Sequence, residues 1–575
     1  MLMTSSDVPA RSSRSVLDLV GIAENVTSVA DPAGLVRELA AAAGMTLKNP
    51  AGVIAANARL ALGSAGAFRA AAERAIGRDN PGPIASTRGD KRFSDPAFQE
   101  NPAYFLLAQQ YLLFGQLVTE LLDTAGVSGA QKAKARFAAN FLVDALAPTN
   151  TLVGNPAAVR KAFDTGGKSI GRGLKNLVHD LRRNGGWPSQ VDSSGFEVGV
   201  NMGATPGSVV YRSDLIELIQ YSPQTANTHA VPLVFCPPWI NKFYIMDLAP
   251  GKSLIEWAVQ QGHTCFAISY RNPDKSMSEL GFRDYLFQGP LDAVRVVKDI
   301  TGAPAVNTVS VCLGGTLTAL GLSYNAARGD ESIQSATFLN THTDFTQPGL
   351  LGTFTDEATV AGLEKQMRKK GFLDSATMAR TFSALRPNDL IFQYLVNNWL
   401  LGNKPPSFDL LAWNEDSTRL PARMHSEYLR SCYLHNEFAR GEFEIDGDRL
   451  DPGLVNVDTY VLSAVDDHVV PWTSGYKTTQ LLGGKSRFVL SSSGHIAGIV
   501  NPPSPKAKHW VNDSLSGDAH EWKSHAQLVD ATWWQDWTAW IAERGGDMVP
   551  APDHPGNDVY PPIEEAPGSY VRATT

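Results

Sequence analysis

Short β-branched runs alternate with helical stretches between residues 231 and 492, and this alternation restricts the fold more than any other feature. The expected strands are "VPLVFC" (231–236), "TCFAISY" (264–270), "TVSVC" (308–312), "SATFLN" (335–340), "VDTYVLSAV" (457–465) and "RFVLSS" (487–492). Helices are expected between several of them, at 252–261, 285–301 and 316–328. Strands that alternate with helices form a mainly parallel sheet covered on both faces. The sequence therefore predicts an α/β class fold.

The third of these strands runs into a helix through a turn of small residues around Cys312, in "NTVSVCLGGTLTALGLSYNAARG". A nucleophile elbow has this form and requires small neighbours two positions away, here Ser310 and Gly314. The helix dipole and free N–H groups favour a thiolate at this point. The N–H of Leu313 would face a developing oxyanion. The alternative is that Cys312 is a small core residue.

Two further candidates follow later strands, in the chain order nucleophile, acid, histidine that α/β-hydrolase sites use. Asp466 and Asp467 follow the strand at 457–465, and His495 follows the strand at 487–492. Open α/β sheets build their sites at the carboxyl ends of strands. The sequence therefore predicts an α/β-hydrolase fold with a Cys–Asp–His triad, although the residues alone do not decide between Asp466 and Asp467.

The rest of the chain gives a domain plan. Residues 1–195 are rich in alanine and leucine with helical spacing from residue 15, with turn signals such as Asn49-Pro50 and Asn101-Pro102, and predict a mostly helical domain. Residues 196–575 are the expected catalytic domain. The insert at about 341–451 is too long for a structureless loop and predicts a cap over the sheet.

Composition excludes several classes of protein. The net charge of −8 argues against a nucleic-acid binder. Four cysteines without ligand spacing predict free thiols, with neither disulfides nor a metal site. No run of 18 apolar residues occurs, so no membrane span is expected, and residues 1–30 have no apolar signal core. We expect a cytoplasmic protein.

Several motifs resemble the polyhydroxyalkanoate synthases, most closely their single-subunit class I enzymes. The matching segments are "VCLGGTL", "PPWINKFYIMDL", "SYRNPD", "LRPNDL", "VNNWLLGNKPPSFDLLAWN", "DDHVVPW" and "SGHIAGIVNPP". The resemblance covers the chain from about residue 196 to its end and is weaker in the helical part. Ser310 stands where many members have glycine, which is a small change.

The resemblance implies a function and a set of site residues. Cys312 would hold the growing acyl chain, Asp467 rather than Asp466 would be the acid, and His495 would be the base. The substrate would be a 3-hydroxyacyl-CoA, with short chains such as 3-hydroxybutyryl-CoA expected, and the products CoA and a polyester on an intracellular granule. A homodimer, possible granule-associated proteins as partners, and no cofactor beyond the CoA of the substrate are also expected.

Sulfur suits this chemistry, because transfer from CoA to Cys312 exchanges one thioester for another and the next step to a hydroxyl is favourable. His495 or Asp467 would deprotonate that hydroxyl. A backbone N–H near Ile240 would be the second oxyanion donor. Substrate-binding candidates are Asn241, Arg386, Trp413 and His468. For three of them a structural role is the alternative: an ion pair with Asp389 or another acid for Arg386, core packing for Trp413 and other cap aromatics, and a loop position for His468.

Two rival functions use the same residues differently. A cysteine-nucleophile thioesterase or polyester hydrolase would need the same triad. A non-catalytic granule protein would keep the fold without needing Cys312. The motifs alone do not exclude the hydrolase, whereas the intact Cys312, Asp467 and His495 argue against the non-catalytic protein.

Overall fold

The computed structural model of the protein describes residues 32–87, 90–127 and 129–574, and the chain divides into two units. The described part of the first unit runs to Val127 and continues at 135–189 and 386–403. The second unit contains 190–385 and the chain from residue 404 onwards, together with the short segment 129–134. Residues 1–31, which contain the segment expected to lack a signal and the start of the expected helical region, lie outside the described residues.

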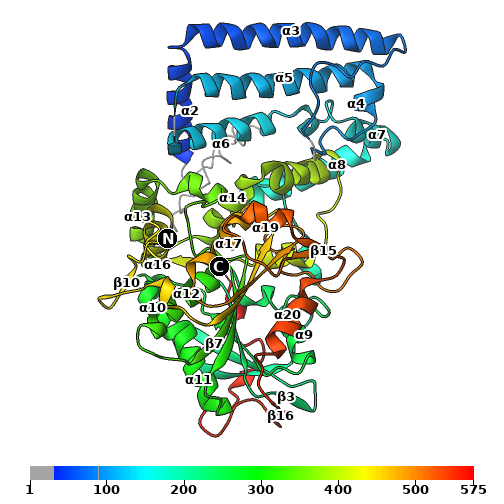
Figure 1. Cartoon of the computed structure of the whole chain (residues 1–575). Helices are drawn as coiled ribbons and strands as arrows, with labels where there is room; N and C mark the ends of the chain where they lie inside the picture. Colours follow the sequence, from blue (N-terminus) through cyan, green and yellow to red (C-terminus); the bar gives the residue numbers. More distant parts are fainter. Residues whose placement is uncertain (1–31, 88–89, 128, 575) are drawn as a thin grey trace, which may run out of the picture. The chain divides into compact units, whose positions relative to one another are not determined.

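The first unit is helical, and asparagine–proline pairs begin three of its helices. Asn49, Asn101 and Asn155 each accept a hydrogen bond from a backbone N–H of the following turn, and a proline occupies the first helical position. The helices are α2 (Pro32–Thr46), α3 (Pro50–Ala75), α4 (Ala97–Glu100), α5 (Pro102–Thr124), α6 (Gly129–Ala145), η1 (Pro148–Asn150), α7 (Pro156–Asp164) and α8 (Lys168–Arg183). Figure 1 shows α3 and α5 running side by side, and Ser64 of α3 donates a hydrogen bond to Gln110 of α5.

Two of these helices are long and apolar enough to cross a membrane by length and composition alone. They are α3 and α5. In the most apolar 18-residue window of each helix, only 11% is buried in α3 and 33% in α5. No membrane span was expected from the sequence, because neither helix holds an unbroken apolar run. A helix with so little buried area presents a largely apolar surface to its surroundings.

The segment 386–403, which sequence analysis placed in the cap, groups with the first unit instead. It forms the short helices η7 (Asn388–Phe392) and η8 (Leu395–Leu400). The indole N–H of Trp399 donates to Asp180 of α8 at 2.7 Å, and the rings of Phe392 and Phe141 lie 5.9 Å apart. These aromatic side chains therefore belong to the core of the helical unit.

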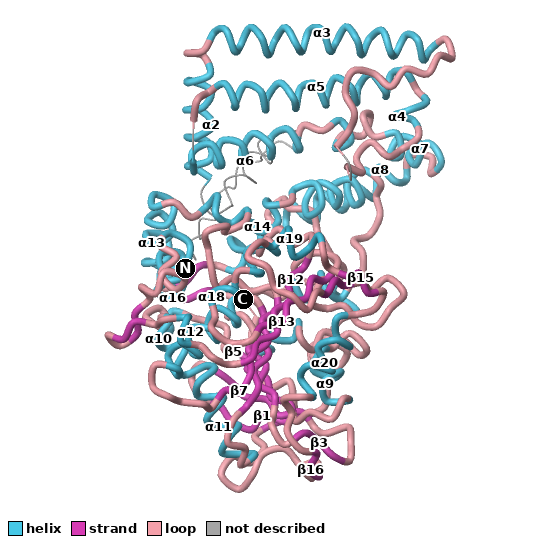
Figure 2. The backbone as a smooth tube through the Cα atoms, viewed as in Figure 1, coloured by secondary structure: helices cyan, strands magenta, loops and turns pink. Residues whose placement is uncertain are grey.

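The second unit is built on one sheet. Within the described residues its strand order is β15-β14-β13-β12-β7-β6-β4-β5-β2-β1-β17. The strands are β1 (Gly207–Arg212), β2 (Ile216–Tyr221), β4 (Leu233–Cys236), β5 (Cys265–Tyr270), β6 (Val306–Val311), β7 (Ile333–Leu339), β12 (Asp458–Ala464), β13 (Ser486–Ser491), β14 (His509–Val511), β15 (Gln527–Val529) and β17 (Glu564–Glu565). Figure 2 shows these strands, in magenta, at the centre of the unit.

The central strands, from β13 to β5 in the sheet order, are parallel, whereas the strands added at both edges are antiparallel. The parallel strands are the six expected from the sequence, each within two residues of its expected bounds. The α/β class and the mainly parallel sheet are therefore confirmed. Strands β1 and β2, which precede the expected ones, were not predicted.

Helices cover both faces of the sheet (Figure 1). α10 (Phe282–Leu286), α11 (Asp292–Thr301) and α12 (Leu313–Ala326) lie on one face, and α9 (Leu254–Gln260) and α20 (Trp533–Ala542) lie on the other. The single helix expected at 285–301 is broken by η5 (Phe287–Leu291), because Gly289 has non-helical dihedral angles and Pro290 follows it. Smaller elements of this part are η2 (Ser193–Gly195), β3 (Asn227–His229), η3 (Phe243–Ile245), η4 (Lys275–Met277), α17 (Trp472–Tyr476), α18 (Thr478–Leu481), α19 (Ala519–Ser524), β16 (Met548–Pro550) and η11 (Tyr570–Arg572).

The insert between β7 and β12 folds into short helices and two small strand pairs, as its length predicted. Outside 386–403 it contains η6 (Leu350–Phe354), α13 (Glu357–Lys370), β8 (Phe372–Leu373), α14 (Ser375–Leu385), α15 (Asp409–Glu415), β9 (Leu420–Pro421), α16 (Ala422–Glu427), η9 (Tyr428–Leu434), β10 (Glu444–Ile445), β11 (Asp448–Arg449) and η10 (Pro452–Leu454). η9 is a π-helical segment that directly continues α16. Such segments are rare and are often found at functional sites.

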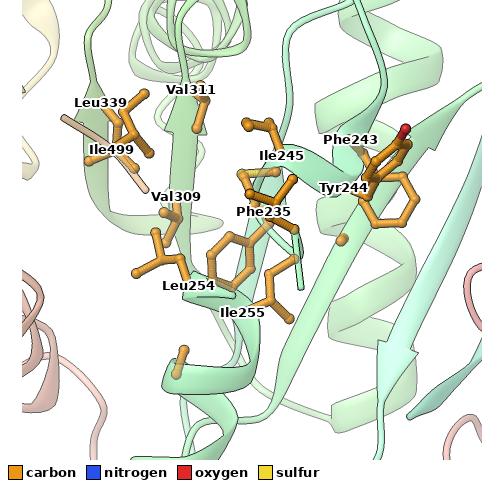
Figure 3. Packing of buried hydrophobic residues seen from close by; sticks show 14 of the residues in the cluster. Phe235, Phe243, Tyr244, Ile245, Leu254, Ile255, Val309, Val311, Leu339 and Ile499 are labelled. Carbon is orange, nitrogen blue, oxygen red and sulfur yellow. The ribbon is translucent and has the colours of Figure 1, made fainter. Parts of the chain in front are cut away.

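One hydrophobic core of the second unit lies between the sheet and the helices α9 and α20. Figure 3 shows Phe235 of β4 packed with Leu254 and Ile255 of α9 and with Val309 of β6. Burial of such side chains supplies the main favourable free energy of folding. A rigid sheet core of this kind holds the carboxyl ends of β6, β12 and β13 in fixed positions, and the predicted triad residues follow these ends.

Candidate active site

Cys312 occupies the sharp turn between β6 and α12. β6 ends at Val311, α12 begins at Leu313, and Cys312 between them has φ 50° and ψ −119°. A positive φ is uncommon for a residue other than glycine and is found at strained functional positions. The structure therefore contains the nucleophile elbow that the sequence predicted.

Gly314 allows this turn to approach the neighbouring strand. A Cβ atom at Gly314 would lie 2.2 Å from the carbonyl oxygen of Cys236 and 2.6 Å from that of Pro237. At Gly315 a Cβ atom would lie 2.2 Å from Oγ1 of Thr341. The absence of both side chains is therefore a packing requirement at the start of α12.

Asp467 and His495 form a hydrogen-bonded pair beyond the ends of β12 and β13. Nδ1 of His495 lies 2.6 Å from Oδ2 of Asp467, and the Asp467 side chain is fully shielded from solvent. The other carboxylate oxygen accepts the N–H groups of Val469 and Val470 at 2.8 and 2.9 Å. Asp466, by contrast, is exposed. The structure thus places Asp467 against the histidine, as the resemblance implied.

His495 contacts Cys312 as well as Asp467. Burial alone would lower the pKa of His495, yet the charge of Asp467, the charge of Cys312 and hydrogen bonds to both raise that pKa well above its ordinary value. The three side chains therefore form one continuous array, in the order acid, imidazole, sulfur. Asn340 supports the array by donating its side-chain N–H to the backbone carbonyl of His495.

The two residues predicted to supply oxyanion donors belong to the start of α12 and to the segment after β4, which come into close contact at Gly314. Leu313 is the first residue of α12, so its N–H has no acceptor within the helix. Ile240 is buried and lies four residues after the end of β4, on the segment that begins with the Cys236 and Pro237 carbonyls. Asn241, which follows, has a φ of 65°, and its own N–H donates to Thr418 at 2.9 Å.

Two of the remaining predicted substrate-binding residues, Arg386 and Trp413, have structural contacts. Arg386 belongs to the first unit and forms an ion pair with Asp389 at 2.5 Å, which was the alternative considered from the sequence. Trp413 is buried in the main core and donates its indole N–H to the Lys242 carbonyl at 2.9 Å. His468 is half-buried directly after Asp467. No contact of Arg386 or Trp413 points to a ligand role.

His342, which was not predicted from the sequence, lies beside the triad. Its Nε2 lies 3.3 Å from the carbonyl oxygen of Val469, and its Nδ1 lies 3.1 Å from Oγ of Ser474. Burial lowers the pKa of His342 to about 4, so the ring is neutral at pH 7. His342 is the third residue after the end of β7, and this position beyond a strand end is the signal that identifies it in retrospect.

An aromatic cluster on the insert was also missed. Burial raises the pKa of Tyr428 and of Tyr433 of η9, and nearby Cys312 adds to the rise in the pKa of both phenols. Their rings pack on Trp239 and Phe345, at centroid distances of 5.6 Å for Trp239–Tyr428 and 5.0 Å for Phe345–Tyr433. No pattern in the insert distinguishes these tyrosines from core residues. In residues 32–87, 90–127 and 129–574, no group of three or more His, Cys, Asp or Glu side chains is placed to hold a metal ion.

Comparison with known proteins places this site in a family. A model described as the N-terminus of poly-beta-hydroxybutyrate polymerase (PhaC) matches residues 89–258, and a model of the alpha/beta hydrolase fold matches residues 231–502. A poly(3-hydroxyalkanoate) polymerase of Methylorubrum extorquens is 40% identical over 543 residues, 94% of this chain and 90% of the relative. The chain belongs to the poly(3-hydroxyalkanoate) polymerase family.

Other polymerases of this family show the same degree of similarity. The poly(3-hydroxyalkanoate) polymerase subunit of Cupriavidus necator is 42% identical over 84% of this chain and 83% of its own length. Poly(3-hydroxyalkanoate) polymerase 1 of Ectopseudomonas oleovorans is 42% identical over 85% of this chain and 87% of its own length. Family membership confirms the resemblance, the α/β-hydrolase fold and the assignment as an acyltransferase enzyme. The individual roles of the site residues stay predictions.

Proposed function

We propose that this enzyme polymerises short-chain 3-hydroxyacyl-CoA, such as 3-hydroxybutyryl-CoA, through a thioester on Cys312. The observation that carries the proposal is a cysteine on a strained elbow, in contact with His495, whose ring is held by a fully buried Asp467. Nucleophile, base and orienting acid in this arrangement activate a thiol for acyl transfer. CoA is both the activating group of the substrate and a product, so the proposal requires no separate cofactor.

The first half-reaction moves the acyl group from CoA to Cys312. His495 accepts the thiol proton, the sulfur adds to the thioester carbonyl, and the N–H groups of Leu313 and Ile240 stabilise the oxyanion. The carbon–sulfur bond to CoA then breaks, and the imidazolium returns the proton to the CoA sulfur. One thioester replaces another, so this step is nearly thermoneutral and can be repeated.

The second half-reaction forms the ester. The 3-hydroxyl of an incoming 3-hydroxyacyl-CoA loses its proton to His495, its oxygen attacks the thioester carbonyl of the chain on Cys312, and the Cys312 sulfur leaves and takes back the proton from His495. The lengthened chain is then carried by CoA and returns to Cys312 through the first half-reaction. Geometry supports His495 rather than Asp467 as the base for this hydroxyl. Both carboxylate oxygens of Asp467 already accept hydrogen bonds, from Val469, Val470 and His495, and the side chain is shielded from solvent. The thioester-to-ester step is favourable and drives chain growth.

Location and assembly complete the proposal. We place the enzyme in the cytoplasm on the surface of its polyester, as a homodimer, with granule-associated proteins as further partners. The apolar surfaces of α3 and α5 are compatible with attachment to a water-insoluble product.

The test is product analysis with purified protein and 3-hydroxybutyryl-CoA. Release of CoA with formation of insoluble polymer is expected, and free 3-hydroxybutyrate without polymer would identify a hydrolase instead. Cys312→Ala should abolish both CoA release and polymer. Cys265→Ala, which removes a buried cysteine of β5 instead, should retain activity. A parallel assay with an eight-carbon 3-hydroxyacyl-CoA tests the short-chain preference, which would be contradicted by faster turnover of the longer substrate.

A further inference from the structure

Two phenol groups beside the nucleophile, one buried and one half-buried, have no part in the mechanism above. Tyr428 is the first residue of η9, the π-helical continuation of α16, and Tyr433 is the residue before its last. Tyr428 is only 5% exposed. Phenylalanine would fill the same volume, so the hydroxyl groups are what requires an explanation. Placing a hydroxyl in an apolar site is unfavourable unless it forms hydrogen bonds.

The surroundings of the two rings are aromatic on several sides. Tyr428 packs edge-on against Trp239 at 5.6 Å and against Tyr433 at 5.3 Å. Phe345 contacts both tyrosines and stacks on His342. Rings held by this many neighbours are fixed in orientation, so their hydroxyl groups point in defined directions.

The hydrogen bond between the two phenols has a direction. The O–H of Tyr428 donates to the hydroxyl oxygen of Tyr433 at 3.3 Å. The proton of Tyr433 is therefore directed elsewhere and is available to a further acceptor. Burial raises the pKa of both phenols above the ordinary value, so each keeps its proton at neutral pH.

The position of Tyr433 relative to Cys312 suits one particular acceptor. The Tyr433 ring lies 5.0 Å from that of Phe345, which stacks on His342 beside the triad, whereas the side chain hydrogen-bonded to Cys312 is that of His495. In an acyl group on Cys312, the 3-oxygen is separated from the sulfur by the thioester carbon and two further carbons. The 3-oxygen therefore lies too far from the sulfur to share the sulfur's hydrogen-bond partner, and a different donor near Cys312 can reach it.

We propose that Tyr433, oriented by Tyr428, donates a hydrogen bond to the 3-oxygen of the acyl group carried by Cys312, and so selects 3-hydroxyacyl over unsubstituted acyl groups. The proposal rests on the proposed function, since it assumes a Cys312 thioester. A site built to bond a substrate oxygen discriminates against analogues without it, because the buried donor is then left unpaired. Tyr428 acts through Tyr433 and is a positioning residue.

The experiment measures single-turnover acylation of Cys312, by intact-protein mass spectrometry, with three donors. 3-Hydroxybutyryl-CoA and acetoacetyl-CoA both carry a 3-oxygen that accepts a hydrogen bond, whereas butyryl-CoA has none. Tyr433→Phe should slow acylation by the first two about 10-fold and leave the butyryl-CoA rate within twofold of wild type. Comparing each donor with itself in wild type and variant cancels differences in intrinsic reactivity.

Two further variants complete the design. Tyr428→Phe keeps the Tyr433 donor but removes its orienting partner, so a smaller loss of about threefold is expected with the same two donors. Tyr560→Phe removes a phenol hydroxyl that bonds Asp299 instead and should change no rate. If Tyr433→Phe does not fold, as judged by its thermal midpoint, Tyr428→Phe provides the same donor comparison.

The outcomes separate the two proposals. Equal losses with all three donors, or no loss with any, would overturn the role of Tyr433. A loss with 3-hydroxybutyryl-CoA but not with acetoacetyl-CoA would mean that Tyr433 accepts rather than donates, which also contradicts it. Absence of any Cys312 adduct in wild type would instead refute the proposed thioester mechanism.

Discussion

At Asp467, a single carboxylate both orients His495 and supplies the negative charge that raises its pKa. Asp467→Asn keeps the size of the side chain and removes that charge. We expect the pKa of His495 to fall and kcat/KM for CoA release to drop by about 10³-fold or more, because the imidazole then lacks its orienting anion. Steady-state assays with 3-hydroxybutyryl-CoA measure this loss.

The neighbouring residue supplies the control for this prediction. Asp466→Asn removes an equal charge one position away, on an exposed side chain. Its kcat/KM should stay within about twofold of wild type. A similar loss in both variants would mean that net charge near the site, rather than the contact with His495, sets the rate.

The same pair of aspartates shows what sequence can decide at this scale. Cys312 and His495 are predictable, because small neighbours and positions beyond strand ends give them a recognisable pattern. Asp466 and Asp467 share that pattern, and a difference of one position in a turn decides which side chain points inward. The N–H groups of Val469 and Val470 fix that orientation, and backbone donors leave no trace in the sequence.

Helix α12 depends on close contact between its first turn and the end of β4. Gly314→Ala would place a Cβ atom 2.2 Å from the Cys236 carbonyl, which is backbone and cannot rotate away. We expect a loss of roughly 3 kcal/mol in the free energy of unfolding and a large fall in CoA release, because the Leu313 N–H shifts with the turn. Urea unfolding and activity assays measure the two effects.

A second glycine isolates the contact from the effect of alanine on a helix. Gly362 lies within α13, and a Cβ atom there would meet nothing within 4 Å. Gly362→Ala should be neutral or stabilising by up to about 1 kcal/mol, since alanine favours helices. If Gly314→Ala were equally harmless, the close approach of α12 to β4 would be contradicted.

At the scale of elements, the parallel strands are predictable and the insert is only partly so. The strands are short apolar runs between turns, and their bounds differ from those expected by no more than two residues. The insert holds aromatic residues that sequence analysis assigned to a cap. Phe392 and Trp399 instead pack with Phe141 and Asp180 of the helical unit. Apolar character shows that a side chain is buried but does not show which core receives it.

Across the second unit, buried histidines link stability to pH. Burial lowers the pKa of His263 to about 3, that of His342 to about 4 and that of His425 to about 4, against an ordinary value of 6.5. Below pH 6.5 these histidines therefore bind protons in the unfolded chain but stay neutral in the folded protein. The free energy of unfolding should fall as the pH drops from 6.5 towards these values, and the stabilisation is fully present above pH 6.5.

His263 offers the cleanest test of this dependence, because neither of its ring nitrogens has a hydrogen-bond partner among the described residues and its ring stacks on His229. Between pH 6.5 and 5, one such histidine accounts for roughly 2 kcal/mol of lost stability. His263→Phe should therefore lose less stability than wild type between these two pH values. Its free energy of unfolding, followed by tryptophan fluorescence in urea, should fall by roughly 2 kcal/mol less than that of wild type. The variant should also be at least as stable as wild type at pH 7.5, since phenylalanine leaves no polar atom unpaired.

The control is His554→Gln, at an exposed position, which should lose as much stability between pH 6.5 and 5 as wild type does. An equal loss of stability in wild type and His263→Phe between the two pH values would show that His263 is protonated in the folded protein, against the burial seen here.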